Sequence, residues 1–319
     1  MTEKDKICYI RPKRALRRLK AAEEENITAY IYGVSGIGKT ELIVRYLKQK
    51  KYQMFDAGRV SAEELEGIAE SEKRKIVVID NLHDLAMEEE CEDIKEAIIS
   101  LIEREDVWLI LSGRCAVPPW LAAVRYREVF YVIEESELLF DEAQENQYIE
   151  YTKILLTPEQ RKVSRNYCLG VPLGWYITWD IYKQIQLREG LKEGEYFSDK
   201  LFSELIDRGL SQMWDYLDWH VYDNWDIRIQ EFLMEVSIVD CFTAHLAEMI
   251  TGINNVESIL SRVKWLGNFM MERTEKDEVV YEFRREMCIS MRRRLKRRQQ
   301  QQHILEKMPF MKMQACIIS

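Results

Sequence analysis

Short runs of apolar residues alternate with helical stretches along the first part of the chain. Five runs are rich in β-branched and aromatic residues and apolar at nearly every position: 27–32, 52–57, 75–80, 107–112 and 129–134. Continuous apolar runs of this length are typical of strands that are covered on both faces, as in a parallel sheet. Stretches with helical spacing separate the first four runs, at 40–50, 61–70 and 91–104. This alternation predicts right-handed βαβ units in an open sheet.

The strand pattern stops near residue 136, and helical patterns follow at 136–154, 157–170 and 173–191. Near residue 226 the pattern changes again. Three helical stretches precede two short strands, a turn at 274–278 and a last helix. The three stretches cover 227–239, 243–251 and 255–266, and the strands cover 268–273 and 279–283. This order is typical of a winged helix.

These changes of pattern divide the chain into four parts. We expect an α/β nucleotide-binding domain (1–135), a helical bundle (136–222), a winged helix (223–298) and a disordered tail (299–319).

The composition, 47% hydrophobic and 32% charged over 319 residues, is that of an ordinary globular protein. No apolar run approaches the roughly 20 residues that span a bilayer, and the first residues lack the apolar core of a secretory signal. We therefore expect a cytoplasmic protein with no membrane partner. Seven cysteines and four histidines lie scattered, without the spacing of a metal site or a disulfide framework. The net charge of −9 argues against a broad nucleic-acid-binding surface.

The run at 27–32 is followed directly by GVSGIGKT, which fits the pattern G-x-x-x-x-G-K-[ST] at every position. Its glycines let the backbone turn N–H groups toward phosphate oxygens, its lysine reaches the β- and γ-phosphates, and its threonine hydroxyl binds Mg²⁺. The buried strand before the motif and the helix after it are the required context, and the helix dipole favours an anion. The expected phosphate-binding residues are Gly33, Val34, Ser35, Gly36, Ile37, Gly38, Lys39 and Thr40.

The run at 75–80 ends in Asp80, which we expect to hold Mg²⁺ together with Thr40. A typical hydrolase has a second acid directly after this aspartate to polarise the attacking water. Here that residue is Asn81, whose amide orients water but cannot accept its proton at neutral pH. Asp84 and Glu88 are alternatives that the sequence does not place. The chain is therefore expected to be at most a slow ATPase.

The run at 107–112 leads into Arg114. An arginine at the carboxyl end of a central strand is able to reach a γ-phosphate and report its presence. The alternative is a surface arginine that caps a loop.

Taken in order over residues 8–298, the motifs resemble the N-terminal switch module of STAND ATPases, most closely that of LuxR-type bacterial transcriptional regulators related to MalT. The motifs are YIRPKRALRRL, GVSGIGKT, VVIDNLHDL, LILSGR, ELLFDEAQENQYI, LGVPLGW and FMMERTEKDEVVYEFRREM. Many NTPases share the phosphate loop, whereas its combination with LGVPLGW and a winged helix is much more specific. The resemblance implies an α/β P-loop NTPase with a parallel sheet of AAA-like (ASCE) type, followed by a helical domain and a winged-helix domain.

The resemblance also implies roles for single residues and a cofactor, ATP or ADP with Mg²⁺. Gly170 and Pro172 match a Gly-x-Pro turn that packs near the nucleotide base in this family. Arg11 and Pro12 lie where the family's N-terminal linker approaches the adenine, and Arg114 matches a sensor arginine. The family cycles between a closed ADP state and an open ATP state that multimerises, so we expect self-association in the ATP state.

Three departures from the family pattern affect this expectation. Asn81 replaces the second acid, and a winged-helix histidine that touches the ADP β-phosphate corresponds here to Arg284, which is able to pair with phosphate instead. Full-length relatives continue into helical sensor repeats and a C-terminal helix-turn-helix that binds DNA, and neither is in this sequence. We therefore expect a fragment or a short member of the family.

Residues 284–298 carry eight basic residues against one glutamate on a predicted helix. Such a helix either contacts the DNA backbone or is the solvated end of the winged helix, with cations favoured near a helix C-terminus. DNA is thus a partner only through this helix or through a C-terminal helix-turn-helix.

The leading hypothesis is an ATP/ADP-binding switch module of a signal-responsive transcriptional regulator. Its alternative is a winged-helix protein that binds DNA directly through the basic helix. A kinase or fast ATPase ranks last, because the sequence places neither the acid nor the acceptor site that such an enzyme needs.

Overall fold

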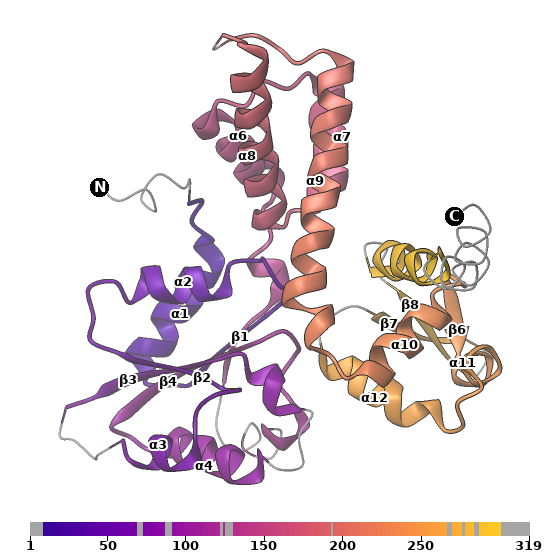
Figure 1. Ribbon diagram of the computed structural model, residues 1–319. Coiled ribbons are helices and arrows are strands. Elements are labelled where there is room, and N and C mark those ends of the chain that lie inside the picture. The colour runs from indigo at the N-terminus through magenta and orange to yellow at the C-terminus, as the bar shows by residue number, and fades with distance from the viewer. Residues whose placement is uncertain are drawn as a thin grey trace, which may run out of the picture. The chain divides into compact units, whose positions relative to one another are not determined.

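The computed structural model describes residues 9–68, 73–86, 91–121, 124, 130–192, 194–266, 270–275, 278–283 and 287–300. The chain folds into two compact units (Figure 1). The first comprises Met1–Asp218 and Trp265–Gly267, and the second comprises Trp219–Lys264 and Asn268–Ser319.

A five-stranded sheet forms the centre of the first unit, and all of its paired strands run parallel. The strands are β1 (Ala29–Tyr32), β2 (Gln53–Asp56), β3 (Lys75–Asp80), β4 (Val107–Gly113) and β5 (Tyr131–Ile133). Their order is β2-β3-β4-β1-β5, so β4 lies between the strand before the GVSGIGKT motif and the strand that ends in Asp80. This inserted strand is the mark of the ASCE type, and the predicted fold class is confirmed.

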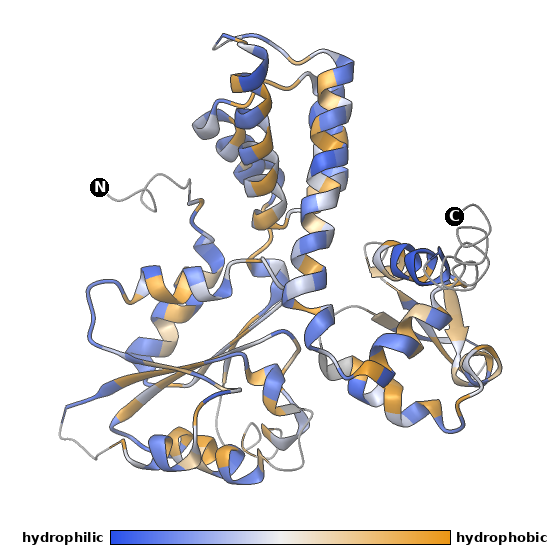
Figure 2. Cartoon of the chain, in the orientation of Figure 1, coloured by the Kyte–Doolittle hydropathy of each residue, from blue (hydrophilic) through white to orange (hydrophobic). Residues whose placement is uncertain are grey.

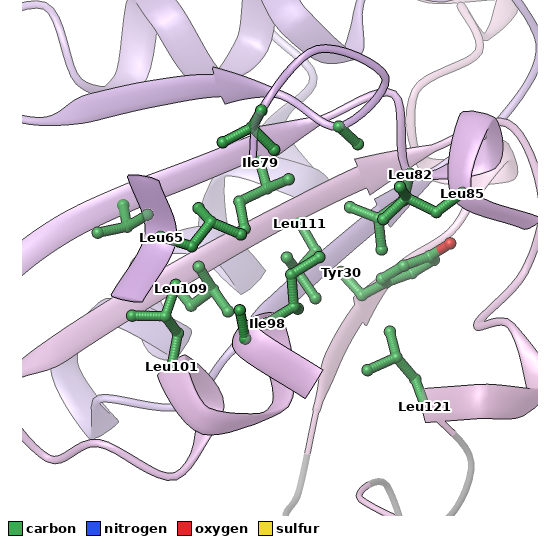
Figure 3. Close-up of a cluster of buried hydrophobic side chains, with 14 of the residues drawn as sticks. Tyr30, Leu65, Ile79, Leu82, Leu85, Ile98, Leu101, Leu109, Leu111 and Leu121 are labelled. Atoms are coloured by element: carbon green, nitrogen blue, oxygen red, sulfur yellow. The ribbon is translucent and has the colours of Figure 1, made fainter. Parts of the chain in front are cut away.

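Helices cover both faces of the sheet, which is why the inner strands β1, β3 and β4 bury successive residues (Figure 1). α1 (Lys13–Glu25) and α2 (Lys39–Tyr46) pack on the face that carries Ile110 of β4, and α3 (Ala62–Glu66) and α4 (Glu92–Ile102) on the face that carries Leu109 and Leu111. Figure 3 shows the second of these cores, in which Leu65 and Ile98 meet the strand residues. Successive residues of β4 thus bury their side chains in opposite cores.

Four helices complete the first unit: α6 (Glu142–Thr152), α7 (Pro158–Cys168), α8 (Pro172–Glu189) and α9 (Asp199–His220). Asp141 and Thr157 begin α6 and α7 with capping boxes, in which the cap side chain and the residue three positions later satisfy each other's backbone N–H groups. Trp175 and Tyr182 are buried between the helices, and the Tyr182 ring stacks on Phe197 with centroids 4.4 Å apart. The predicted helical region is confirmed. None of the helices in the described residues is long and apolar enough to cross a membrane.

The second unit combines helices with a small antiparallel sheet in the order β6-β8-β7. Its elements are α10 (Ile227–Val236), β6 (Cys241–Thr243), α11 (Ala244–Thr251), α12 (Val256–Leu266), β7 (Met270–Glu275) and β8 (Glu278–Phe283), with residues 287–300 helical. The predicted order of helices, strands and a last helix is confirmed.

The small sheet differs from the prediction in two places. β6 was not predicted, because three residues are too few to show a period; it is held by pairing with β8 and by burial of Phe242 against Phe232 and Phe283. The predicted turn at 274–278 is too long, since Glu275 pairs with Glu278. Backbone pairing does not depend on the polar side chains that made this stretch resemble a turn. Residues 299–300 continue the last helix, and the rest of the predicted tail lies outside the described residues.

Candidate phosphate-binding site

The GVSGIGKT loop joins the end of β1 to the start of α2, at the carboxyl edge of the sheet. Gly36 has φ of +82°, and a Cβ at this position would lie 2.6 Å from a side-chain carbon of Leu173. Gly38 caps α2 with φ of +97°. Both are backbone conformations that residues with a Cβ rarely adopt, so the path of the loop requires the two glycines.

Lys39 lies inside this loop, where its Nζ donates to the carbonyl oxygens of Gly33 at 2.7 Å and Val34 at 3.2 Å. Burial lowers the pKa of Lys39 to about 8, and the nearby Asp80 carboxylate opposes this shift. A partly buried ammonium favours an anion at the same place, because the anion compensates for the lost hydration. Glu135 accepts a hydrogen bond from the Val34 N–H of the loop at 3.0 Å.

Asp80 ends β3 with its carboxylate buried among hydrogen-bond donors. Oδ2 accepts from the Thr40 hydroxyl at 2.6 Å, and Oδ1 accepts from the Asn81 backbone N–H at 2.9 Å and from the Ser112 hydroxyl. Hydroxyl and carboxylate oxygens are the ligands that Mg²⁺ prefers. Thr40 and Asp80 therefore fit a magnesium ion beside the phosphate loop.

Asn81 adopts a left-handed backbone conformation with φ of +62°. Its side-chain amide donates to Asp56 Oδ2 at 2.7 Å. Asp56 was not among the residues that sequence reasoning selected. A signal existed, because the run at 52–57 carries its aspartate at the strand end as the run at 75–80 does, but only the strand order makes the two neighbours.

Of the two alternative acids, Asp84 is half-exposed and its Oδ1 lies 3.4 Å from His83 Nε2. Burial, together with the cations of Arg114 and Lys39, lowers the pKa of His83 to about 2, so its imidazole is neutral at physiological pH. Glu88 lies outside the described residues.

Arg114 directly follows β4 and is largely enclosed. Burial lowers the pKa of its guanidinium, whereas Asp84 and Tyr216 oppose the shift, and the group keeps its charge. Tyr216 comes from α9, and its hydroxyl is hydrogen-bonded to Ser35 of the phosphate loop at 2.9 Å. The loop, the end of β4 and α9 thus meet at one place.

A cavity of about 380 Å³ adjoins the phosphate loop at Gly36, Ile37 and Gly38. Its walls are mostly apolar and aromatic, which suits the flat ring of a base. Besides the loop they comprise Tyr9, Ile10, Pro12, Glu41, Arg45, Leu138, Phe140, Tyr148, Pro172, Leu173 and Tyr176.

Of the residues expected near the base, some line the cavity and others do not. Pro12 and Pro172 line the cavity. Gly170 supports the turn before α8: its φ is +74°, its carbonyl accepts from the Phe140 N–H, and a Cβ would lie 2.8 Å from the Phe140 carbonyl oxygen. Arg11 is exposed and outside the cavity, and Arg284 lies outside the described residues.

Comparison with known proteins finds a family model that matches the C-terminal part of the chain. Residues 218–303 match the family model of the MalT winged helix domain. A comparison with curated proteins gives no significant match.

Solved structures resemble most of the chain. The Walker-type ATPase PABY2304 of Pyrococcus abyssi is similar with a TM-score of 0.63 and 13% identity, over 89% of this chain and 96% of that chain. A variant of RuvB from Thermotoga maritima is similar with a TM-score of 0.51 and 12% identity, over 87% and 94%. At such identities the likeness establishes the fold alone. The chain thus has a P-loop ATPase fold joined to a winged helix of the MalT kind.

Proposed function

We propose that this chain is an ATP/ADP-binding switch module of a signal-responsive transcriptional regulator, with slow ATP hydrolysis. The observation that carries the proposal is the continuity of two features. A glycine loop with a partly buried lysine, a hydroxyl and a carboxylate adjoins a mostly apolar cavity of about 380 Å³ that is large enough for a base.

Each group has a role in this proposal. The backbone of the loop and Lys39 hold the phosphates, and Pro12 and Pro172 cover the base. Thr40 and Asp80 hold Mg²⁺, which neutralises phosphate charge when it is bound. Arg114 senses the γ-phosphate at the end of β4.

The hydrogen bond between Ser35 and Tyr216 supports a switch over a simple binding protein. α9 carries Tyr216 and ends at His220, just past the residue at which the two units divide. A change in the loop that accompanies ATP or ADP therefore has a direct covalent route toward the winged helix.

Direct DNA binding through the last helix has weaker support. Figure 2 shows this helix mostly in the hydrophilic colour, but several of its arginines are engaged within their own unit. Arg292 pairs with Asp240 at 2.8 Å, Arg298 with Glu231 at 3.1 Å, and Arg294 lies over the Tyr222 ring at 3.7 Å. These contacts favour the solvated, structural interpretation of the helix.

The test is thermal unfolding of the full chain with and without Mg²⁺ and ADP or ATP. A ligand at about 100 times its Kd stabilises the folded state by about 2.7 kcal/mol. We expect this stabilisation for the natural sequence and its loss in Lys39→Ala. The matched control is Lys48→Ala, which removes an exposed lysine and should retain the full shift. Equal stabilisation of Lys39→Ala and the natural sequence would refute the phosphate site.

A further inference from the structure

The position after Asp80 lacks an acid, yet the structure brings an acid to the same edge from another strand. β2 and β3 are parallel neighbours, and Asp56 pairs in register with Asp80 at their carboxyl ends. In-register residues of neighbouring parallel strands direct their side chains to the same face of a sheet. The two aspartates therefore emerge together at the carboxyl edge of the sheet, where Asp80 accepts a hydrogen bond from Thr40 of the phosphate loop.

Asn81 connects these two aspartates. Its backbone N–H donates to Asp80 Oδ1 at 2.9 Å, and its side-chain amide donates to Asp56 Oδ2 at 2.7 Å. The left-handed φ of +62° allows one residue to make both bonds, and asparagine tolerates that conformation better than most residues. The Gly58 N–H donates to Asp56 Oδ1 at 3.1 Å. The Asp56 carboxylate is thus oriented from two sides while its side chain remains partly exposed to water.

The other described acids near the loop are placed less favourably. Asp84 lies 3.4 Å from His83, and its side chain is 46% exposed. Glu135 follows β5, next to the loop strand β1, and its carboxylate is already engaged by the Val34 N–H. Asp80 is assigned to the metal. Glu41 lines the cavity beside the loop and pairs with Arg45. We select Asp56, which lies on the strand next to the metal-binding aspartate.

We propose that Asp56 is the proton acceptor for ATP hydrolysis and that Asn81 is its positioning residue. This inference rests on the proposed nucleotide site and deepens it. The oxygen of a water molecule bonds to the γ-phosphorus, and the bond from that phosphorus to the bridging oxygen breaks, with the electron pair leaving on ADP. The proton lost by the water passes to the Asp56 carboxylate and then to solvent. The family's second acid is in this way supplied from β2, with Asn81 as its support.

The test is single-turnover hydrolysis of γ-labelled ATP by the full chain in the presence of Mg²⁺, with the Kd for a fluorescent ADP analogue measured in parallel. Asp56→Asn is expected to slow hydrolysis by about 100-fold, the lower range for a lost general base, while the Kd stays within about twofold. Asp56→Glu keeps a carboxylate and is expected to stay within about tenfold of the natural rate. Asn81→Ala is expected to slow hydrolysis with the Kd retained, because Asp56 loses its orienting donor.

Asp93→Asn is the matched control, since it makes the same change at an exposed position in the first turn of α4 and should leave the rate unchanged. Hydrolysis by Asp56→Asn at the natural rate would overturn the inference, as would loss of hydrolysis in Asp84→Asn alone. ATP binding without any hydrolysis by the natural sequence would also overturn it and leave the nucleotide site standing. Absence of nucleotide binding would refute the proposed function itself.

Discussion

His83 is a single residue whose surroundings set its charge. It lies just after β3, buried, with its Nδ1 unpartnered within the described residues, and burial is the largest cause of its lowered pKa. The folded chain therefore holds His83 neutral at pH values at which an unfolded histidine is already protonated. At Gly36 the surroundings set the residue type, because Leu173 fills the space in which any side chain at this position would lie.

The pKa of about 2 for His83 leads to a prediction about acid stability. Below the unfolded pKa of about 6.5, the unfolded chain binds a proton that the folded chain does not, so the free energy of unfolding falls as the pH falls. The slope from one such group approaches about 1.4 kcal/mol per pH unit. We expect His83→Gln to remove it, which urea denaturation at pH 7, 6 and 5 would measure. Carboxylates contribute equally to both proteins. If the free energy of unfolding changes with pH by the same amount in both, the prediction is contradicted.

At the scale of elements, the phosphate loop, Asp80 and Arg114 all lie at the carboxyl ends of the strands. α9, from the helical region, contacts the loop there. Its Tyr216 hydroxyl lies 2.9 Å from the Ser35 hydroxyl. α8 also takes part, since the Leu173 N–H donates to the Gly36 carbonyl at 3.2 Å. The phosphate loop is therefore hydrogen-bonded to two helices from outside the α/β domain, and we expect a change in the loop to reach both of them.

Tyr216→Phe tests the link through α9. Loss of one hydrogen bond is expected to lower the free energy of unfolding by only about 1 kcal/mol. The larger effect should be on coupling: the difference in hydrogen exchange of α9 between the ADP-bound and ATP-bound protein should shrink. Tyr196→Phe is the control, because it removes a hydroxyl from an exposed tyrosine. If α9 exchanges identically in both variants, Tyr216 does not transmit the state of the loop.

At the scale of the whole molecule, one chain joins a P-loop ATPase fold to a MalT-type winged helix. The second unit is held together by its own contacts, among them the Phe242 core and the ion pairs of Arg292 and Arg298. Each unit thus keeps its own interior, so the nucleotide is expected to change the state of the molecule without unfolding either one.

Self-association is the property of the whole molecule that we expect to depend on the bound nucleotide. With Mg²⁺ and a slowly hydrolysed ATP analogue we expect a concentration-dependent rise in mass by light scattering, and with ADP a monomer. Lys39→Ala should stay monomeric with either nucleotide, because it lacks the ammonium that holds the phosphates. Equal masses of the natural protein in both nucleotides would contradict a switch that acts through assembly.

Local patterns determined much of this protein. The apolar runs predicted the five strands, and the glycines and Lys39 of GVSGIGKT indicated a phosphate loop. The changes of pattern near residues 136 and 226 predicted the helical region and the winged helix. These features depend on neighbours in the sequence, so periodicity and residue type are enough to find them. Only the tertiary structure decided which strand ends are adjacent, and therefore that Asp56 lies beside Asp80. It also decided that Tyr216 of α9 contacts Ser35 of the loop. The same holds for β6 and for the cavity walls, because pairing partners and enclosed space arise from contacts between residues that are distant along the chain.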